Sequence, residues 1–160
     1  MITIAFLADQ PQHLPVVAAW VYDQWHRHRP GETLKTTAEM FRAALQRDAI
    51  PLTLLALDGD VPVGTASLFA DDMETRPELT PWLASVYVAP ERRGAGIGPR
   101  LVRAAEDVAR QLGVKQLYLF TPDRERFYAR LGWRTVEHSA YDGHPVVIMA
   151  RSLAGGEEPS

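Results

Sequence analysis

A glycine-rich turn carries the clearest chemical signal in the sequence. Residues 88–99 read VAPERRGAGIGP, in which three alternating glycines separate an apolar stretch from a predicted helix. Glycine lets the backbone approach a ligand closely, and Pro99 suits a first helical turn, where its missing N–H costs nothing. Unpaired amides at a helix N-terminus bind anions, and Arg92 and Arg93 add positive charge. The turn therefore predicts a phosphate-binding site.

Two widespread phosphate-binding motifs do not match this turn. A P-loop ends in Gly-Lys followed by Ser or Thr, and the chain has no such run. A dinucleotide-binding turn has its third glycine one place later, with an acid about 20 residues further on. The predicted strand at residues 115–121, KQLYLFT, has no acid. The remaining alternative is a turn that only tightens the packing of strand on helix.

A longer pattern identifies the turn more specifically. The run V-x-P-x-x-R-G-x-G-I-G resembles the diphosphate loop of the GNAT superfamily of acyl-CoA-dependent N-acyltransferases, and Arg93, Gly96 and Gly98 match its core. A second signature of that superfamily, F-Y-x-x-L-G-W after a strand, is present at residues 127–133. The order of predicted elements is also similar, so the resemblance covers about residues 1–151.

The resemblance implies acetyl-CoA or another acyl-CoA as co-substrate. No metal is expected, because His26 and His28 are two residues apart and face different sides of a helix. By the family's pattern the pantetheine arm pairs with the strand backbone at Val86 and Val88, in a gap beside the strand that ends at Thr121. The diphosphate would lie on the loop, and the second signature would approach the donor. The residues implied on these two segments are Arg93, Gly94, Ala95, Gly96, Ile97, Gly98, Arg126 and Phe127, with Arg92 and Arg100 as further candidates for the ribose phosphate.

Tyr128 is the predicted catalytic residue. The chain has no cysteine and no serine in a G-x-S-x-G turn, so we expect the amine to attack the thioester directly in a ternary complex. Tyr128 resembles the superfamily's tyrosine that acts as general acid toward the departing sulfur. Two alternatives stay open: a core tyrosine with its hydroxyl on a backbone carbonyl, and a non-catalytic domain that senses acyl-CoA or binds a partner.

The general base and the acceptor are not fixed by the sequence. GNAT enzymes often carry a carboxylate on the strand before the loop, but residues 82–88, WLASVYV, contain none. The candidates for the base are Asp72, Glu74, Glu78, His144 and a water molecule. A weak base favours a small-molecule or peptide amine of low pKa, such as an α-amino group near ~8, over a lysine near ~10.4. The length of the acyl chain also stays open.

The acceptor is expected between the first two helices, residues 71–82 and the final hairpin. Aromatic surface there would come from Trp20, Tyr22, Trp25, His26 and Trp82, and polar groups from Asp71, Asp72, Glu74, Arg76, Glu137, His138, Tyr141 and His144. Residues 91–134 hold nine Arg and one Lys against five acids, while the rest of the chain holds seven bases against fifteen acids. An anionic donor is therefore expected at the basic segment and a cationic amine outside it.

Hydrophobic periodicity predicts the elements that position these residues. The fold class is mixed α/β with a largely antiparallel central sheet flanked by helices, which the resemblance implies is of the GNAT type. The turns at residues 58–60 and 142–143 predict hairpins, and Thr36 with Glu39 predicts a capping box for the second helix. Strands are expected at residues 2–6, 52–57, 61–69, 82–88, 115–121, 133–141 and 145–151, and helices at 14–25, from 36, at 99–112 and at 124–131.

The composition is that of one ordinary globular domain. The 160 residues are 46% hydrophobic, carry a formal charge of −3 and contain no apolar run or leader pattern of the membrane or secreted classes. We expect a single domain at residues 1–153, a polar tail at 154–160 and a cytoplasmic location. Binding to nucleic acid or membrane is not expected, because the basic segment lacks interleaved aromatics. A homodimer stays an open alternative.

Overall fold

The computed structural model describes residues 1–154, and it is organised around one seven-stranded sheet in the order β1-β2-β3-β4-β5-β7-β6. Of the predicted tail, residues 155–160 lie outside the described residues. All neighbouring strands are antiparallel except β4 and β5, which confirms the predicted fold class. The strands are β1 (Ile2–Phe6), β2 (Leu52–Asp58), β3 (Val61–Phe69), β4 (Trp82–Val88), β5 (Gln116–Thr121), β6 (Arg134–Tyr141) and β7 (His144–Ser152).

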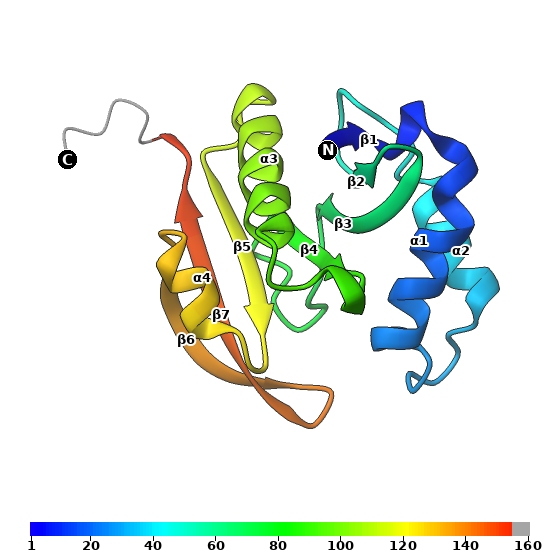
Figure 1. Cartoon of the computed structure of the whole chain (residues 1–160). Helices are drawn as coiled ribbons and strands as arrows, with labels where there is room; N and C mark the ends of the chain where they lie inside the picture. The colour runs from blue at the N-terminus through cyan, green and yellow to red at the C-terminus, as the bar shows by residue number, and fades with distance from the viewer. Residues whose placement is uncertain (155–160) are drawn as a thin grey trace.

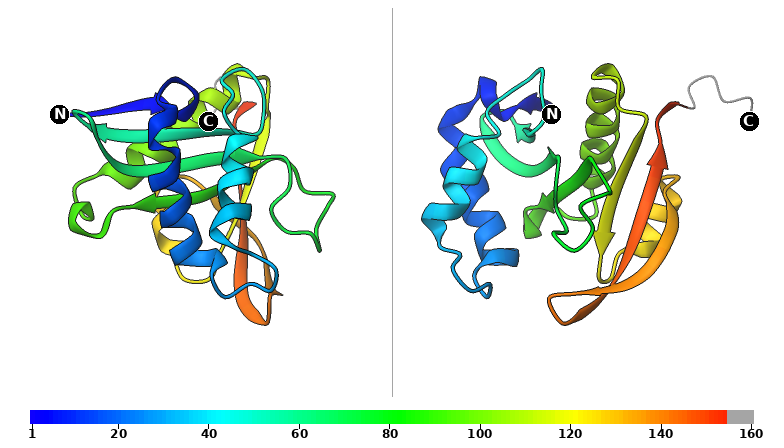
Figure 2. Two further views of the ribbon diagram at one scale, coloured as in Figure 1. Left: turned by 90° about the vertical axis from the view of Figure 1, so that its right-hand side faces the viewer. Right: turned by 180° about the vertical axis from the view of Figure 1, so that it is seen from behind.

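Helices cover both faces of the sheet (Figures 1 and 2). One face carries α1 (Leu14–Val21), which continues as a π-helical turn at Tyr22–His26, and α2 (Leu34–Arg42). The other face carries α3 (Ile97–Gln111) and α4 (Glu125–Arg130). Short 3-10 turns occur at Leu7–Asp9, Pro11–His13 and Pro90–Arg92. Within residues 1–154, none of the helices has the length and apolarity that crossing a membrane requires.

Strand β2 shows how the sequence fixes these two layers. Its residues are buried on both sides, which explains the continuous apolar run LTLLAL. Leu52 and Leu54 pack in the cluster that contains α3, whereas Leu55 and Leu57 pack in the cluster that contains α1 and α2. Because side chains alternate along a strand, one apolar run serves both cores.

The start of α2 differs from the prediction. Thr33 is the N-cap residue, and its hydroxyl accepts a hydrogen bond from the Thr36 N–H at 3.0 Å. The Thr36 hydroxyl accepts one in return from the Thr33 N–H at 2.9 Å, which completes a capping box. The box expected for Thr36 and Glu39 is therefore wrong by three residues. The sequence offers two threonines at capping spacing, and the hydroxyl at Thr36 is used inside the first turn.

The parallel pair at the centre of the sheet is short. Only Trp82 and Tyr118 are in register between β4 and β5, and the C-terminal ends of these strands point away from each other (Figure 1). A bulge in β4 accompanies the divergence, because the register against β3 shifts there and Ser85 has a φ of 56°. Before the bulge, β4 pairs with β3 and, at Trp82, with β5. After the bulge it pairs with β3 alone, so its other edge is unpaired.

Candidate active site

The glycine-rich loop leaves the start of α3 uncapped. Gly94 and Gly96 have φ values of 83° and 84°, and Gly96 is the N-cap residue of α3 without any side-chain cap. A Cβ built on either glycine would meet no atom within 4 Å, so this side of the loop is open. The first amides of a helix have no partner within the helix. The loop is therefore open at the start of α3, where the glycine pattern predicts an anion site.

The two arginines before the loop are already engaged. Arg93 Nε donates to the Val88 carbonyl oxygen at 2.9 Å, and its guanidinium lies 5.4 Å from the centre of the Tyr87 ring. Arg92 Nη1 donates to Asp58 Oδ2 at 2.7 Å. The carboxylate of Asp58 therefore neutralises Arg92. The loop's capacity for an anion rests on its amides and on arginines from other segments.

The second half of β4 offers backbone groups on its free edge. The Ala89 N–H donates to Val63 of β3 at 2.9 Å, so the peptide groups of Val88, one residue earlier, face the β5 side. The groups of Val86 face the same way, two residues before. In the described part of the chain no strand pairs with this edge beyond Trp82, although Arg93 occupies the Val88 carbonyl. This free edge contains Val86 and Val88, the positions that the resemblance implied for an extended ligand.

Tyr128 lies near the loop in the core cluster shared by α3 and the sheet. Its neighbour Phe127 is stacked edge-on against it with centroids 4.9 Å apart, and a Cβ on Gly98 would lie 3.5 Å from Phe127. Tyr128 is 8% exposed, and burial raises its pKa to about 12. Its hydroxyl forms no hydrogen bond with another protein group in residues 1–154. It is also not among the fully buried polar atoms that lack a partner. The phenol is thus protonated and free to donate to a ligand.

Thr121, which the resemblance implied beside the cofactor, also has a local structural role. Its hydroxyl oxygen accepts hydrogen bonds from the amides of Arg124 at 3.0 Å and Asp123 at 3.4 Å. These bonds close the turn between β5 and α4. The side chain of Thr121 therefore fixes the start of the helix that carries Tyr128.

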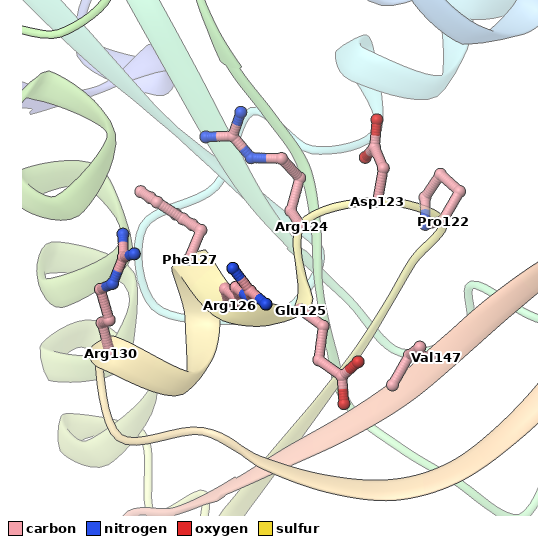
Figure 3. A pocket seen from close by; sticks show the side chains of 8 residues that line it. All are labelled: Pro122, Asp123, Arg124, Glu125, Arg126, Phe127, Arg130 and Val147. Atoms are coloured by element: carbon pink, nitrogen blue, oxygen red, sulfur yellow. The ribbon is translucent and has the colours of Figure 1, made fainter.

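A basic groove lies beside α4 and was not predicted as a unit. It has a volume of about 520 Å³ and is lined by Pro122, Asp123, Arg124, Glu125, Arg126, Phe127, Arg130 and Val147 (Figure 3). The Arg124 guanidinium lies 4.7 Å from the centre of the Phe127 ring. Figure 3 shows three arginine side chains grouped around Phe127, with Glu125 turned toward Val147. Of these arginines, the sequence pointed only to Arg126.

On the opposite face, the three segments predicted to bind the acceptor lie together. Arg29, in the connection between α1 and α2, has its Nε 3.6 Å from Asp142 Oδ2 in the β6–β7 turn. Arg76, in the connection between β3 and β4, donates to Glu137 of β6 at 2.7 Å. These two ion pairs join the helical layer, the long β3–β4 connection and the last hairpin around one region.

Among the side chains proposed as base, Asp72 differs from the other three. Asp72 is half-buried, and this burial raises its pKa to about 7 against the opposing effect of Arg29. Its carboxylate forms no ion pair or hydrogen bond with the residues that the structure describes. Glu78 is exposed, and its hydrogen bond from Arg76 lowers its pKa. Glu74 and His144 are also exposed.

Two of the aromatic residues expected on the acceptor surface belong to the core. Trp82 is 0% exposed, and His26 is buried with its Nδ1 2.9 Å from the Thr37 hydroxyl. Trp25 is 37% exposed and lies edge-on to Tyr87, with centroids 6.2 Å apart. The helical spacing of Trp25 and His26 could not separate the exposed ring from the buried one, since α1 changes to a π-helical turn at Tyr22–His26. No group of three potential metal ligands occurs among residues 1–154.

Comparisons with known proteins agree with this geometry. Residues 15–133 match the model of the Acetyltransferase (GNAT) family. N-alpha-acetyltransferase 80 of Mus musculus is 30% identical over 132 residues, which cover 80% of this chain and 40% of that protein. The chain thus spans less than half the length of this curated relative.

Solved structures share the fold at lower identity. An aminoglycoside 6'-N-acetyltransferase complexed with coenzyme A superimposes with a TM-score of 0.72 at 18% identity, covering 94% of this chain and 97% of that chain. The protein yncA of Salmonella typhimurium, solved with acetyl-CoA, gives 0.73 at 17% identity, covering 99% and 98%. These two similarities extend over nearly the whole of each chain.

Proposed function

Because the chain belongs to the GNAT acetyltransferase family, we propose that it transfers an acetyl group from acetyl-CoA to a primary amine by direct attack in a ternary complex. The observation that carries this proposal is the placement of Tyr128. This buried, protonated phenol packs in the cluster that also contains Val86 and Val88. The same cluster contains Ile97, at the beginning of α3.

The donor would extend along the free edge of the second half of β4, whose other edge pairs with β3. Its diphosphate would accept hydrogen bonds from the amides of residues 93–98, and its pantetheine amides would pair with the backbone at Val86 and Val88. The basic groove at Arg124, Arg126 and Arg130 would hold the ribose phosphate. This arrangement directs the thioester toward the divergence between β4 and β5, next to Tyr128.

Tyr128 would act on the departing sulfur. The neutral amine attacks the thioester carbon, the tetrahedral intermediate collapses, and the carbon–sulfur bond breaks with its electron pair on sulfur. The pKa of Tyr128, about 12, lies above that of a thiol, near ~8.5, so the phenol stays protonated until this moment. It donates a hydrogen bond to the developing thiolate. Because the phenol is the weaker acid by about 3.5 pKa units, full transfer of its proton to sulfur requires the site to stabilise the phenolate, which water then reprotonates.

Asp72 would accept the proton of the amine. Its pKa of about 7 is close to that of an α-amino group, near ~8, and far from that of a lysine, near ~10.4. Proton transfer between groups of similar pKa is efficient. The acceptor is therefore proposed to be an amine of low pKa, such as the α-amino group of a small molecule or peptide. The name of the mouse relative, an N-alpha-acetyltransferase, agrees with this choice.

A non-catalytic acyl-CoA sensor is the second candidate function. The observation that favours it is the absence of any carboxylate in β4, WLASVYV. Calorimetry with acetyl-CoA and a thiol-release assay over a panel of amines distinguish the two functions. An enzyme releases thiol with at least one amine, whereas a sensor binds acetyl-CoA and releases none.

Replacing Tyr128 tests the proposed chemistry. Tyr128→Phe keeps the ring packing and removes the donor, so kcat is expected to fall about 10- to 100-fold while the Kd for acetyl-CoA changes less than about twofold. Steady-state kinetics and calorimetry measure the two quantities. Tyr118→Phe is the matched control, because the Tyr118 hydroxyl is bonded to Gln116 in β5. Equal losses of turnover and affinity in Tyr128→Phe would show a structural role instead.

A further inference from the structure

We infer that Glu106, a carboxylate buried in α3, is a positioning residue that holds Tyr128 in register with the glycine-rich loop. The inference rests on the proposed function, since it takes Tyr128 as the group that acts on the sulfur. The Glu106 side chain is only 3% exposed, on a helix face otherwise built from residues such as Leu101 and Ala105. A carboxylate there is costly unless its partners compensate, so its partners indicate its role.

Glu106 is linked to the turn that follows α4 by two routes. Its Oε2 accepts a hydrogen bond from Trp133 Nε1 at 3.0 Å. Its Oε1 lies 3.6 Å from Arg151 Nε, and Arg151 Nη1 donates to the Gly132 carbonyl oxygen at 3.0 Å. A third partner, Arg103, donates to Oε1 at 3.0 Å from within α3. Both routes that leave α3 therefore end at neighbouring residues, 132 and 133.

Trp133 passes this constraint to Tyr128. The two rings are edge-on, with centroids 6.1 Å apart and an interplanar angle of 66°. The backbone N–H of Trp133 also donates to the backbone carbonyl oxygen of Tyr128, at 3.1 Å. Trp133 is 3% exposed, so its ring lies within the core beside Tyr128. The hydrogen bond that the indole donates to Glu106 orients the indole, and the indole packs against one side of the phenol.

The other end of this connection is the loop. Glu106 lies ten residues after Gly96 in the same helix, a rise of about 15 Å along a rigid element. The helix therefore relates the amides proposed for the diphosphate to the phenol proposed for the sulfur. An apolar side chain could fill the space of Glu106, but it could not orient the Trp133 indole through a directional bond. Small displacements of a catalytic group cost large factors in rate.

A double-mutant analysis tests this role. Glu106→Leu removes the carboxylate, and Trp133→Phe removes the indole N–H while keeping a ring against Tyr128. Each is expected to lower kcat about tenfold and to change the Kd for acetyl-CoA less than about twofold. In a Tyr128→Phe background each is expected to cause no further loss of kcat, because the positioned hydroxyl is already absent.

Asp107→Asn is the matched control on the same helix, since the Asp107 side chain is 67% exposed and pairs only with Arg110 among the described residues. If Glu106→Leu does not fold, Trp133→Phe carries the test alone. The inference would be overturned if these variants lowered kcat by the same factor with and without Tyr128→Phe, or lowered it in neither background. Glu106 would then only stabilise the fold. A normal kcat in Tyr128→Phe itself would instead contradict the proposed acid, and the inference with it.

Discussion

Partial burial raises the pKa of Asp72, and this raised pKa has opposite effects on activity and on stability. A carboxyl of pKa about 7 is a suitable proton acceptor for an amine, but only in its ionised form. Burial is what raises the pKa, so the ionised form is the less stable one in the fold. The folded state therefore loses stability as the pH rises from about 4, the ordinary pKa, through 7.

Asp72→Asn is expected to lower kcat and to remove a limb of the pH profile. In the unmodified protein kcat at saturating amine should rise with pH through about 7, because protonated Asp72 cannot accept the amine proton. The same variant should be more stable than the unmodified protein above pH 7, by at most ~4 kcal/mol, and by less because the carboxyl is only half-buried. Kinetics and thermal unfolding at pH 5 to 9 measure both effects.

Asp71→Asn is the control for this prediction, because Asp71 is the exposed neighbour in the same connection. It should change neither the pH profile nor the stability. An acidic limb near pH 7 that persists in Asp72→Asn would assign the base to another group.

At the scale of elements, the loop and α3 act as one unit because Gly96 is both the last loop residue and the N-cap of the helix. Its φ of 84° disfavours any residue with a Cβ, and its open surroundings leave room for a ligand. Backbone strain and loss of the binding surface are therefore separate consequences of a substitution, and they can be measured separately.

Gly96→Arg is expected to abolish acetyl-CoA binding and to cost about 1–2 kcal/mol of stability. The new side chain would cover the amides that face the ligand. Gly113→Arg provides the matched control, because Gly113 has a φ of 86° and equally open surroundings at the other end of α3. It should show the same loss of stability in thermal unfolding and unchanged binding in calorimetry. Normal binding by Gly96→Arg would refute the assignment of the loop.

The sequence predicted the order of the elements because periodicity and turns report on local structure. Residues 52–57 and 61–69 flank a turn of the hairpin type, and both strands formed. Glu106 was missed because pattern analysis treats a charged residue on a helix as exposed, whereas its partner Trp133 comes from 27 residues away. The burial of Asp72 and Trp82 likewise depends on segments that meet only in the folded chain.

At the scale of the whole molecule, the charge is divided in space as well as along the sequence. In the basic segment, Arg92, Arg103 and Arg110 are neutralised by neighbouring carboxylates. Arg124, Arg126 and Arg130 instead line the groove beside α4. The groove therefore brings together three arginines that form no ion pair among the described residues, beside Asp123 and Glu125.

Arg126→Ala is expected to weaken binding of CoA about three- to tenfold and binding of 3'-dephospho-CoA less, because a phosphate contact is lost. The affinity of the unmodified protein for CoA should fall as ionic strength rises. Arg42→Ala, an exposed change on α2 at the opposite face, is the control. Equal weakening for both ligands would place the ribose phosphate elsewhere.

The single register pair between β4 and β5 bears on how the molecule unfolds. The sheet consists of a four-stranded and a three-stranded part, joined at its centre by few backbone hydrogen bonds of its own. A donor bound along the free edge of β4 would supply part of that junction. Ligand at 100 times its Kd adds about 2.7 kcal/mol to the stability of a folded protein. The cooperative unfolding of the two parts of the sheet would then depend in part on bound acetyl-CoA.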